Sequence, residues 1–298
     1  MNYMLIDTHA HLNFHAFRDD ADEVIKRTSA NDVWVINIGS QYSTSKRAVE
    51  IAQKYQEGIF AAVGLHPIHL EARKVDPAEI SGDAGFQTRV EEFDYEKYKE
   101  LAKFPKVVAI GEIGLDYYWK PKAKKRLEEF KEKQKKVFLQ QLDLAQELNL
   151  PVIFHCRVAH DDLIDFLTTK YKIQNTSLRG VVHCFTGNLD QAQKFLDLGL
   201  CLGFNGLIFK NVPALPDPAE IIQQIPLERI LLETDSPYLT PLLAEVPQSW
   251  TKAESSKEQR NEPLNARYVA EKIAQIKNVS FEKVAKVTTQ NAKKLFQI

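Results

Sequence analysis

The sequence predicts an α/β protein built as one domain, a (β/α)8 TIM barrel. Short apolar runs alternate with amphipathic helical patterns along the whole chain, and there are eight such runs. The runs are almost continuously apolar, which is typical of parallel strands covered by helices. An open doubly wound sheet is the alternative. No G-x-G-x-x-G follows the first run, so we expect neither a dinucleotide-binding sheet nor an organic cofactor.

The elements follow one another in a regular order. The expected strands are residues 4–8, 33–38, 59–64, 107–112, 151–156, 180–184, 200–204 and 229–233. The expected helices lie near residues 20–31, 43–57, 95–104, 126–149, 160–171, 188–198 and 217–225. Residues 263–296 are predicted to form two helices, with Ser280 as the N-cap of the second. Residues 70–94 and 240–260 are polar and turn-rich, so both are expected to be loops on one face of the barrel.

Composition limits the class of protein. The chain has 298 residues, three cysteines in no paired spacing and a net charge of −1. There is no signal-like leader, and no run approaches the roughly 18 apolar residues of a membrane span. We therefore expect a cytoplasmic monomer without a membrane partner. The net charge argues against nonspecific coating of nucleic acid, but it leaves room for a local phosphate site.

Metal-type side chains stand at the ends of several expected strands. His9 and His11 follow the first apolar run, and strand alternation points both imidazoles the same way. Four further candidates occupy the same position on later strands: Glu112, His155, His183 and Asp235. Active sites of (β/α)8 barrels lie at the carboxyl ends of the strands, so these six side chains should meet there.

Six ligands exceed the need of one catalytic ion, which usually takes three protein ligands and a water. Glu112 is the most plausible bridge between two divalent ions, which would be about 3.5–4 Å apart and would lower the pKa of a bridging water towards roughly 7. Imidazoles and carboxylates suit zinc, manganese or iron, and magnesium where nitrogen ligands are fewer.

Simpler interpretations exist for each position. A single strand-end histidine is more often a hydrogen-bonded structural residue, Glu112 could hold a helix N-terminus, and Asp235 could be an N-cap. Cys156 and Cys184 each follow a proposed ligand, and alternation turns them towards the surrounding helices as small core residues.

Several rim residues could meet a substrate. His66 could contact a substrate phosphate, and Arg157 shares the parity of His155; an ordinary structural role or a surface ion pair is the alternative. The basic run 120–126 is a solvated face or a phosphate-steering surface. Tyr117, Tyr118, Trp119 and Tyr238 could stack on bases of a single strand or pack under loops. His15, His69 and His160 are expected at the surface.

With these motifs assembled, the chain resembles the TatD family of metal-dependent deoxyribonucleases, within the amidohydrolase-type barrels. The matching segments are residues 7–12 (DTHAHL), 64–67 (GLHP), 111–117 (GEIGLDY), 150–157 (LPVIFHCR), 183–187 (HCFTG), 233–238 (ETDSPY) and 260–263 (RNEP). They cover nearly the whole length, in order.

The resemblance implies metal positions at His9, His11, Glu112, His155, His183 and Asp235, with Glu112 touching both ions. It implies that Asp235 is also the base that orients or deprotonates the attacking water. His66 and Arg157 would lie beside the substrate phosphate. The implied activity is hydrolysis of DNA phosphodiesters by a metal-bound hydroxide, often as a 3′-to-5′ exonuclease on single strands.

Three features differ from the family pattern. Ile68 stands between Pro67 and His69, Trp119 precedes Lys120 where a basic residue often stands, and the segment from 238 to 260 is longer than usual. All three should line the substrate rim, so they bear on substrate choice.

Two other functions are compatible with the same ligands. One is hydrolysis of an amide, lactone or ester, although such barrels often carry a carbamylated lysine where this chain offers Glu112. The other is a noncatalytic metal-binding scaffold.

Overall fold

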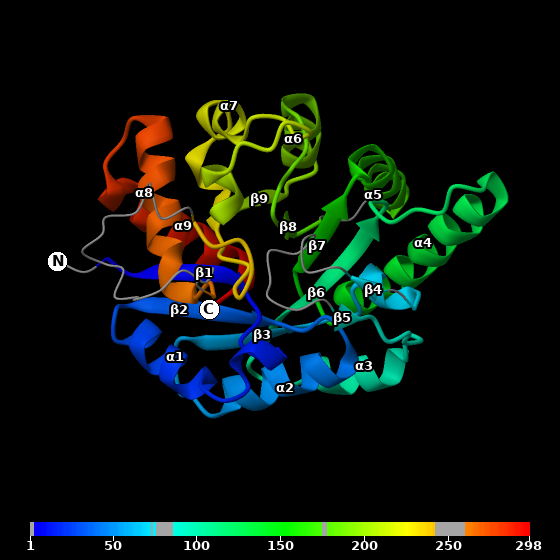
Figure 1. Ribbon diagram of the computed structural model, residues 1–298, viewed down its shortest axis with the longest axis horizontal. Helices are drawn as coiled ribbons and strands as arrows, with labels where there is room; N and C mark the ends of the chain where they lie inside the picture. Colours follow the sequence, from blue (N-terminus) through cyan, green and yellow to red (C-terminus); the bar gives the residue numbers. More distant parts are fainter. Residues whose placement is uncertain (1–2, 73, 76–85, 175–177, 242–259) are drawn as a thin grey trace.

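A sheet of eight parallel strands forms the centre of the protein, in the order β1-β2-β3-β6-β7-β8-β9-β10 (Figure 1). The computed structural model describes residues 3–72, 74–75, 86–174, 178–241 and 260–298. The strands are β1 Leu5–Ala10, β2 Val33–Ile38, β3 Ile59–Val63, β6 Val107–Asp116, β7 Val152–Arg157, β8 Gly180–Val182, β9 Cys201–Phe204 and β10 Ile230–Leu232.

The first strand meets the end of the last one. Ala10 forms a parallel bridge with Ser236. The His11 amide donates to the Ser236 carbonyl, and the Asp235 amide donates to the His9 carbonyl, both at 2.8 Å. These bonds close the sheet, so the predicted (β/α)8 barrel is confirmed and the open sheet is excluded.

Helices cover the outside of the barrel (Figure 1). They are α1 Ala21–Ser29, α2 Tyr42–Gln53, α3 Tyr95–Ala102, α4 Lys124–Glu147, α5 His160–Gln174, α6 Leu189–Asp197, α7 Pro218–Gln224, α8 Ala266–Lys277 and α9 Phe281–Phe296. The predicted N-cap of α9 is confirmed, because the Ser280 hydroxyl accepts a hydrogen bond from the Lys283 amide. Asn278 ends α8 in the left-handed conformation that suits a helix C-terminus.

The amino-terminal end of the barrel is closed by apolar packing. One buried cluster joins inward-facing side chains of the strands, including Ile6, Ile36 and Leu231, to Phe296 at the end of α9. Alternate strand residues, including Phe154 and Cys156, belong to the larger cluster under the outer helices. The predicted outward direction of Cys156 is therefore confirmed.

Two segments depart from the minimal barrel. The region 70–94 contains part of the 3-10 helix Pro67–Leu70 and a two-stranded antiparallel sheet, β4 Lys74–Val75 with β5 Phe86–Gln87. Residues 76–85 of this predicted loop lie outside the described residues, as does most of the predicted loop 240–260. Among the helices that are described, none is long and apolar enough to cross a bilayer.

Candidate metal centre at the barrel mouth

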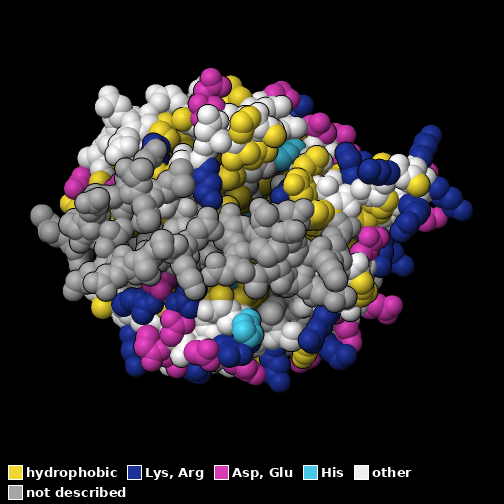
Figure 2. Space-filling view, in the orientation of Figure 1, with side chains coloured by type: hydrophobic (Ala, Val, Ile, Leu, Met, Phe, Trp, Pro, Cys, Tyr) yellow, Lys and Arg dark blue, Asp and Glu magenta, His cyan; other side chains and the backbone are white. Residues whose placement is uncertain are grey.

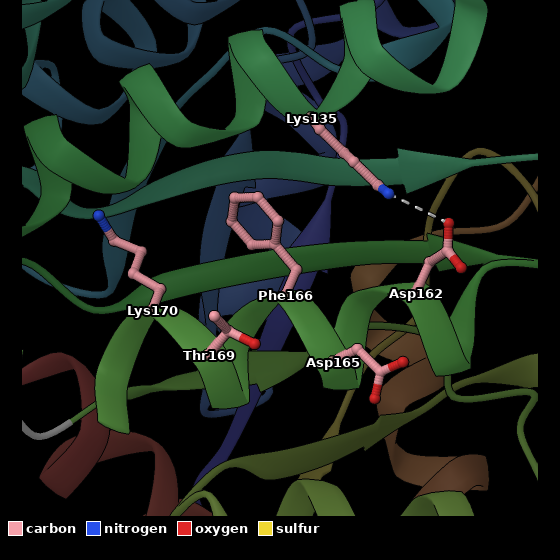
Figure 3. A pocket seen from close by; sticks show the side chains of 6 residues that line it. All are labelled: Lys135, Asp162, Asp165, Phe166, Thr169 and Lys170. Carbon is pink, nitrogen blue, oxygen red and sulfur yellow. Dashed lines mark ion pairs between the residues drawn. The ribbon is translucent and has the colours of Figure 1, made fainter. Parts of the chain in front are cut away.

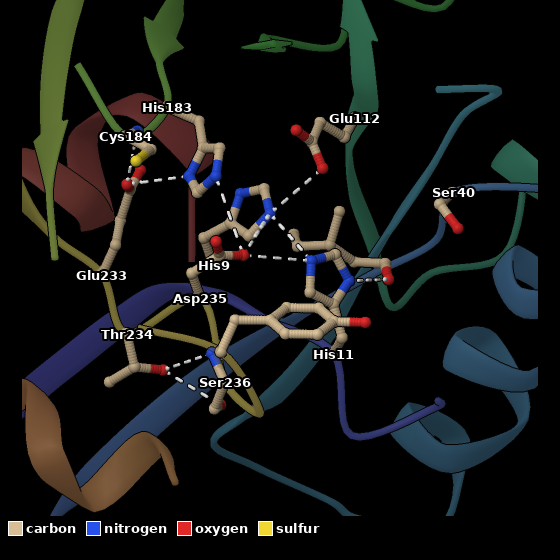
Figure 4. Close-up of polar contacts among 12 residues, drawn as sticks. His9, His11, Ser40, Glu112, His183, Cys184, Glu233, Thr234, Asp235 and Ser236 are labelled. Atoms are coloured by element: carbon tan, nitrogen blue, oxygen red, sulfur yellow. Dashed lines mark hydrogen bonds and ion pairs between the residues drawn. The ribbon is translucent and has the colours of Figure 1, made fainter. Parts of the chain in front are cut away.

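All six predicted metal-type side chains meet at the carboxyl end of the barrel. Figure 4 shows how strands far apart in the sequence bring four of them together: His9, His11, Glu112 and His183, with Asp235 between the histidines. The sixth, His155, lies against Glu112 on the neighbouring strand.

His9, His11 and Asp235 lie where the first strand meets the end of the last one. His9 Nε2 lies 3.2 Å from His11 Nε2, which confirms that alternation directs both rings to one side. Asp235 Oδ1 lies 3.3 Å from His11 Nε2 and 3.8 Å from both His9 Nε2 and His183 Nε2. Asp235 takes a left-handed φ of 57°, a strained conformation for a residue with a side chain. The backbone bond to His9 holds it there.

Glu112 stands between two sets of histidines. Its Oε2 lies 3.3 Å from His9 Nε2, whereas its Oε1 lies 2.7 Å from His155 Nδ1 and 3.4 Å from His66 Nε2. Burial alone would raise the pKa of this carboxyl. The neighbouring His66 and His9 rings and the hydrogen bond with His155 outweigh burial and hold the pKa well below its usual range. Glu112 is therefore a carboxylate with one oxygen directed to each side.

Hydrogen-bond partners indicate which nitrogen of each ring carries the proton. His11 Nδ1 lies 3.0 Å from the Ile38 carbonyl, so it donates and leaves the Nε2 lone pair facing the site. His183 Nδ1 lies 2.8 Å from Glu233 Oε2, so Nε2 is the nitrogen that faces Asp235. A second partner of this kind orients metal-binding histidines in general.

His155 has the opposite arrangement. Its Nε2 lies 3.1 Å from Asp116 Oδ2, which leaves Nδ1 facing Glu112. Burial would lower the pKa of His155, but hydrogen bonds with Asp116 and Glu112 raise it to about 9. His183 behaves likewise: the Glu233 carboxylate offsets burial and raises its pKa to about 10. Both rings therefore sit in sites that favour positive charge.

His66 differs from the other rings. Its Nδ1 accepts a hydrogen bond from the Ile68 amide at 3.0 Å, so Nε2 carries the proton. That N–H points at Glu112 Oε1. Burial, with the nearby His155, lowers the pKa of His66 and favours this neutral form. His66 therefore presents a donor to Glu112 Oε1, whereas His11 presents a lone pair to the site.

The donor set fits divalent cations. Three overlapping groups each gather their ligand atoms within 4.8 Å: His9, His11 and Asp235; His9, Glu112 and His183; His66, Glu112 and His155. Burial, reinforced by His183, lowers the pKa of His9 to about 4 and keeps that ring neutral. Lone pairs and carboxylates facing one another in a buried space repel unless a cation lies between them.

Two supporting carboxylates escaped the sequence analysis. Glu233 was assigned to a strand end without a role, yet it bonds both His183 Nδ1 and the Cys184 amide. Gly203 makes room for it, because a Cβ there would overlap Glu233 Oε1. Asp116 lies on β6, which runs four residues beyond the expected 107–112. Asp116 is an even number of residues from Glu112, so strand alternation could have placed both side chains on the same side.

A further support comes from the segment RNEP. The Asn261 amide donates to the carbonyls of Thr234 and Tyr238, at 2.8 and 2.6 Å, which flank Asp235. Asp7 lies beneath the same turn, and its carboxyl contacts the Thr234 amide and hydroxyl. The turn that carries Asp235 is thus held from two sides.

Three expectations about other residues were wrong. Cys184 does not turn towards the helices, because β8 ends at Val182 and Cys184 lies in the following turn beside Glu233 (Figure 4). His69 and His160 are buried rather than at the surface. His69 lies under residues 89–91, and His160 packs edge-on against Phe185. His15 is exposed as expected.

The aromatic residues predicted at the rim also differ in whether they are buried or exposed. Tyr117 is only 3 % exposed and its hydroxyl bonds Asp162, so it cannot stack on a base. Tyr118 is 47 % exposed. Arg157 places its guanidinium 3.7 Å from the centre of the Tyr118 ring. Among the described residues Arg157 forms no ion pair, so the alternative of a surface ion pair gains no support.

Comparison with known proteins identifies the family. A family model described as TatD related DNase matches residues 6–297. The chain belongs to the TatD family. The metal-dependent hydrolase YabD of Bacillus subtilis is 38 % identical over 297 residues, covering 99 % of this chain and all of YabD. Deoxyribonuclease TATDN3 of Homo sapiens is 31 % identical over 293 residues, covering 98 % of this chain and 94 % of TATDN3.

The fold comparison agrees. The crystal structure of YJJV, a TatD homolog from Escherichia coli, superposes with a TM-score of 0.78 at 28 % identity, and the match covers 100 % of both chains. A TatD family hydrolase from Entamoeba histolytica gives a TM-score of 0.77 at 25 % identity over 99 % of both chains. This TatD protein is a metal-dependent hydrolase with His, Glu and Asp clusters able to bind metal.

Proposed function

We propose that this protein hydrolyses phosphodiester bonds of DNA with two divalent ions held at the barrel mouth. The observation that carries the proposal is the position of Glu112, whose two oxygens face different histidine groups. A carboxylate placed in this way suits a bridge between two ions.

The two groups divide the ligands. His9, His11 and Asp235, with one oxygen of Glu112, would hold the first ion. The other Glu112 oxygen, with His155, would hold the second. The ligand atom of His183 lies within 4.8 Å of those of Glu112 and His9 and would complete the set. Nitrogen and carboxylate donors suit zinc or manganese best, with magnesium less favoured. When bound, such ions supply Lewis acidity: they lower the pKa of water and offset negative charge on phosphate.

Asp235 is the residue suited to accept a proton. Its side chain is 17 % exposed, against 6 % for Glu112 and none for Glu233. Burial would raise the pKa of Asp235, but the hydrogen bond with His11 and the nearby charge of His183 lower it. Asp235 is therefore ionised at neutral pH and can orient an attacking water and take its proton.

His66 and Arg157 would bind the substrate phosphate. The Nε2–H of His66 points into the space beside Glu112. Arg157 follows His155 by two residues on the same strand and has no carboxylate partner among the described residues. A neutral donor and a free cation at one rim suit a phosphodiester, which stays negatively charged throughout hydrolysis.

The choice of DNA as substrate rests on the family and on this rim. TATDN3 is named a deoxyribonuclease. Strand β6 contains no lysine that could take the place of Glu112, which favours a phosphodiesterase over an amide or lactone hydrolase. We assign the chain 3′-to-5′ exonuclease activity on single strands, as a monomer.

The test is turnover of a substrate panel by purified protein. Single- and double-stranded DNA, an amide, an ester and a lactone are incubated with zinc, manganese or magnesium, and again with a chelator. We expect DNA cleavage that the chelator removes and added metal restores. Cleavage that survives chelation, or turnover confined to the amide, ester or lactone, would show the proposed function to be wrong.

A further inference from the structure

The segment between β6 and α4 combines exposed aromatic and cationic side chains beside the metal centre. Tyr118 is 47 % exposed, and five exposed cations follow: Lys120, Lys122, Lys124, Lys125 and Arg126. No Asp or Glu occurs from 117 to 127. Figure 2 shows Lys and Arg side chains gathered on the projection at the right of the view, where Figure 1 places the start of α4.

These cations do not serve the stability of the helix. Within the described part of the chain, none of the five forms an ion pair with a carboxylate. The first turn of α4 contains no acidic residue, and Ala123 provides no side-chain cap. Positive charge at this end of a helix opposes the helix dipole. Three unpaired cations at this destabilising position, with Lys120 and Lys122 just before the helix, indicate an external anion.

The segment is fastened to the metal centre. The Tyr118 amide donates to Asp116 Oδ1 at 2.9 Å, while Asp116 Oδ2 lies 3.1 Å from His155 Nε2. Gln134 of α4 bonds both the amide and the carbonyl of Asp116, at 2.8 and 2.9 Å. One carboxylate thus fixes a histidine of the site and the exposed aromatic residue at a set distance from each other.

Tyr118 lies in a stack that suits a nucleobase. The Arg157 guanidinium covers one face of its ring at 3.7 Å, and Trp119 meets it edge-on, with ring centroids 4.8 Å apart and an interplanar angle of 89°. Unpaired bases stack on aromatic rings and on arginine planes, and a backbone track of cations accompanies such platforms in proteins that bind single strands.

A nearby groove does not extend this surface. Lys135, Asp162, Phe166 and Lys170 line a cavity of about 350 Å³ between α4 and α5 (Figure 3). Lys135 pairs with Asp162 at 3.5 Å, and Lys170 pairs with Asp143 at 2.6 Å. Its cations are already neutralised, so this groove does not extend the unpaired positive charge of 120–126.

We propose that Tyr118, Trp119 and Arg157 form a stacking platform, and residues 120–126 a phosphate track, for the part of a single-stranded polynucleotide that extends beyond the cleaved bond. This inference rests on the proposed function and names the residues that would bind the single strand over several nucleotides beyond the reacting bond. A duplex keeps its bases stacked inside and cannot use the platform.

The track is tested by the salt dependence of binding. Lys122, Lys124 and Lys125 are replaced by Ser together. The matched control replaces Lys283, Lys286 and Lys294, three exposed lysines of α9, the helix that closes the opposite end of the barrel. Affinity for a labelled single strand of about 20 nucleotides is measured by fluorescence anisotropy in the Asp235→Asn background, in which turnover should be slow.

Each lost phosphate contact should reduce the slope of log K against log salt by about 0.7. The 122/124/125 variant should therefore lose about 2 from the slope, and the α9 variant should keep the wild-type slope. Equal changes of the slope in the two variants, or no change in either, would show that residues 120–126 are not a phosphate track.

The platform is tested by Tyr118→Ala, with Tyr118→Phe as the conservative variant. Phe104→Ala is the control, because Phe104 is 41 % exposed and precedes β6 at the far end of the barrel. Tyr118→Ala should weaken binding of a single strand by about 5- to 150-fold, the range for one stacked base. Tyr118→Phe and Phe104→Ala should change it little, and duplex binding should not move. Equal losses for single strand and duplex would refute stacking.

Different results would contradict DNA hydrolysis and the single-strand binding surface. A protein that cleaves DNA with metal but keeps its salt slope and single-strand affinity in these variants has the proposed function without this surface. A protein that neither binds nor cleaves DNA lacks both.

Discussion

The two ends of this barrel are built from the same strands but contain opposite kinds of side chain. At the amino-terminal end, Ile6, Ile36 and Leu231 pack on Phe296 without a charged group among them. At the carboxyl end, four histidines and two carboxylates lie within a few ångströms of one another, and all but His155 and Asp235 are fully buried. Apolar burial stabilises the first end, whereas desolvation of polar groups makes the second end costly. Stability and chemistry should therefore respond to substitutions at different ends.

The largest effect should come from Asp235→Asn. The variant keeps the shape of the side chain but loses the charge that accepts a proton. We expect kcat to fall by about 10²–10⁴-fold while the free energy of unfolding changes little. Steady-state kinetics and urea denaturation measure the two. Asp197→Asn, an exposed residue on α6, is the control. Full activity in Asp235→Asn would show that another group is the base.

Phe296→Ala should have the reverse effect. Phe296 is 3 % exposed and fills the apolar end, so its truncation should lower the free energy of unfolding by about 3–5 kcal/mol. Activity of the folded variant should remain near wild type, because the metal centre lies at the opposite end. Phe104→Ala, at an exposed site, should cost much less. A loss of activity without a loss of stability in Phe296→Ala would contradict the division between the two ends.

Glu233→Gln tests whether a carboxylate behind a histidine of the metal centre supports metal binding. The amide can still accept a hydrogen bond from His183 Nδ1, but the negative charge that raises the pKa of that ring is lost. We expect metal affinity to fall by about 10- to 100-fold, measured by competition with a chromophoric chelator. Glu228→Gln, exposed at the other end of β10, should leave affinity unchanged. Equal metal affinities in the two variants would show that Glu233 does not support metal binding.

The smallest effect should be the pH dependence contributed by buried histidines outside the metal centre. Burial lowers the pKa of His69 to about 3 and that of His160 to about 4. Each is neutral when folded but binds a proton below about pH 6.5 when unfolded. Their contribution to stability is therefore complete above pH 6.5 and is lost as the pH falls towards 4.

His160→Leu should remove the part of this pH-dependent loss of stability that His160 causes. Between about pH 7 and pH 5, its free energy of unfolding should fall by about 1–2 kcal/mol less than that of the wild type. His15→Leu changes an exposed ring and should follow the wild-type profile. Parallel profiles for wild type and His160→Leu would mean that His160 titrates normally in the folded chain.

Short-range patterns in the sequence predicted the positions that local geometry decides and failed where distant residues meet. Alternation along one strand was enough to place His9 beside His11. It failed at Cys184, because β8 ends two residues earlier and the chain turns. It also missed Glu233 and Asp116, whose partners lie 50 and 39 residues away. Local periodicity says which side a residue faces, but not what faces it.

The sequence alone therefore determined the order of strands and helices, the closed barrel and the six side chains gathered at one mouth, because these follow from short-range periodicity and apolar burial. Tertiary structure decided which nitrogen of each histidine faces the site, which carboxylates support the rings, and that Tyr118 rather than Tyr117 is exposed. Those outcomes depend on contacts through space between residues that no local pattern links.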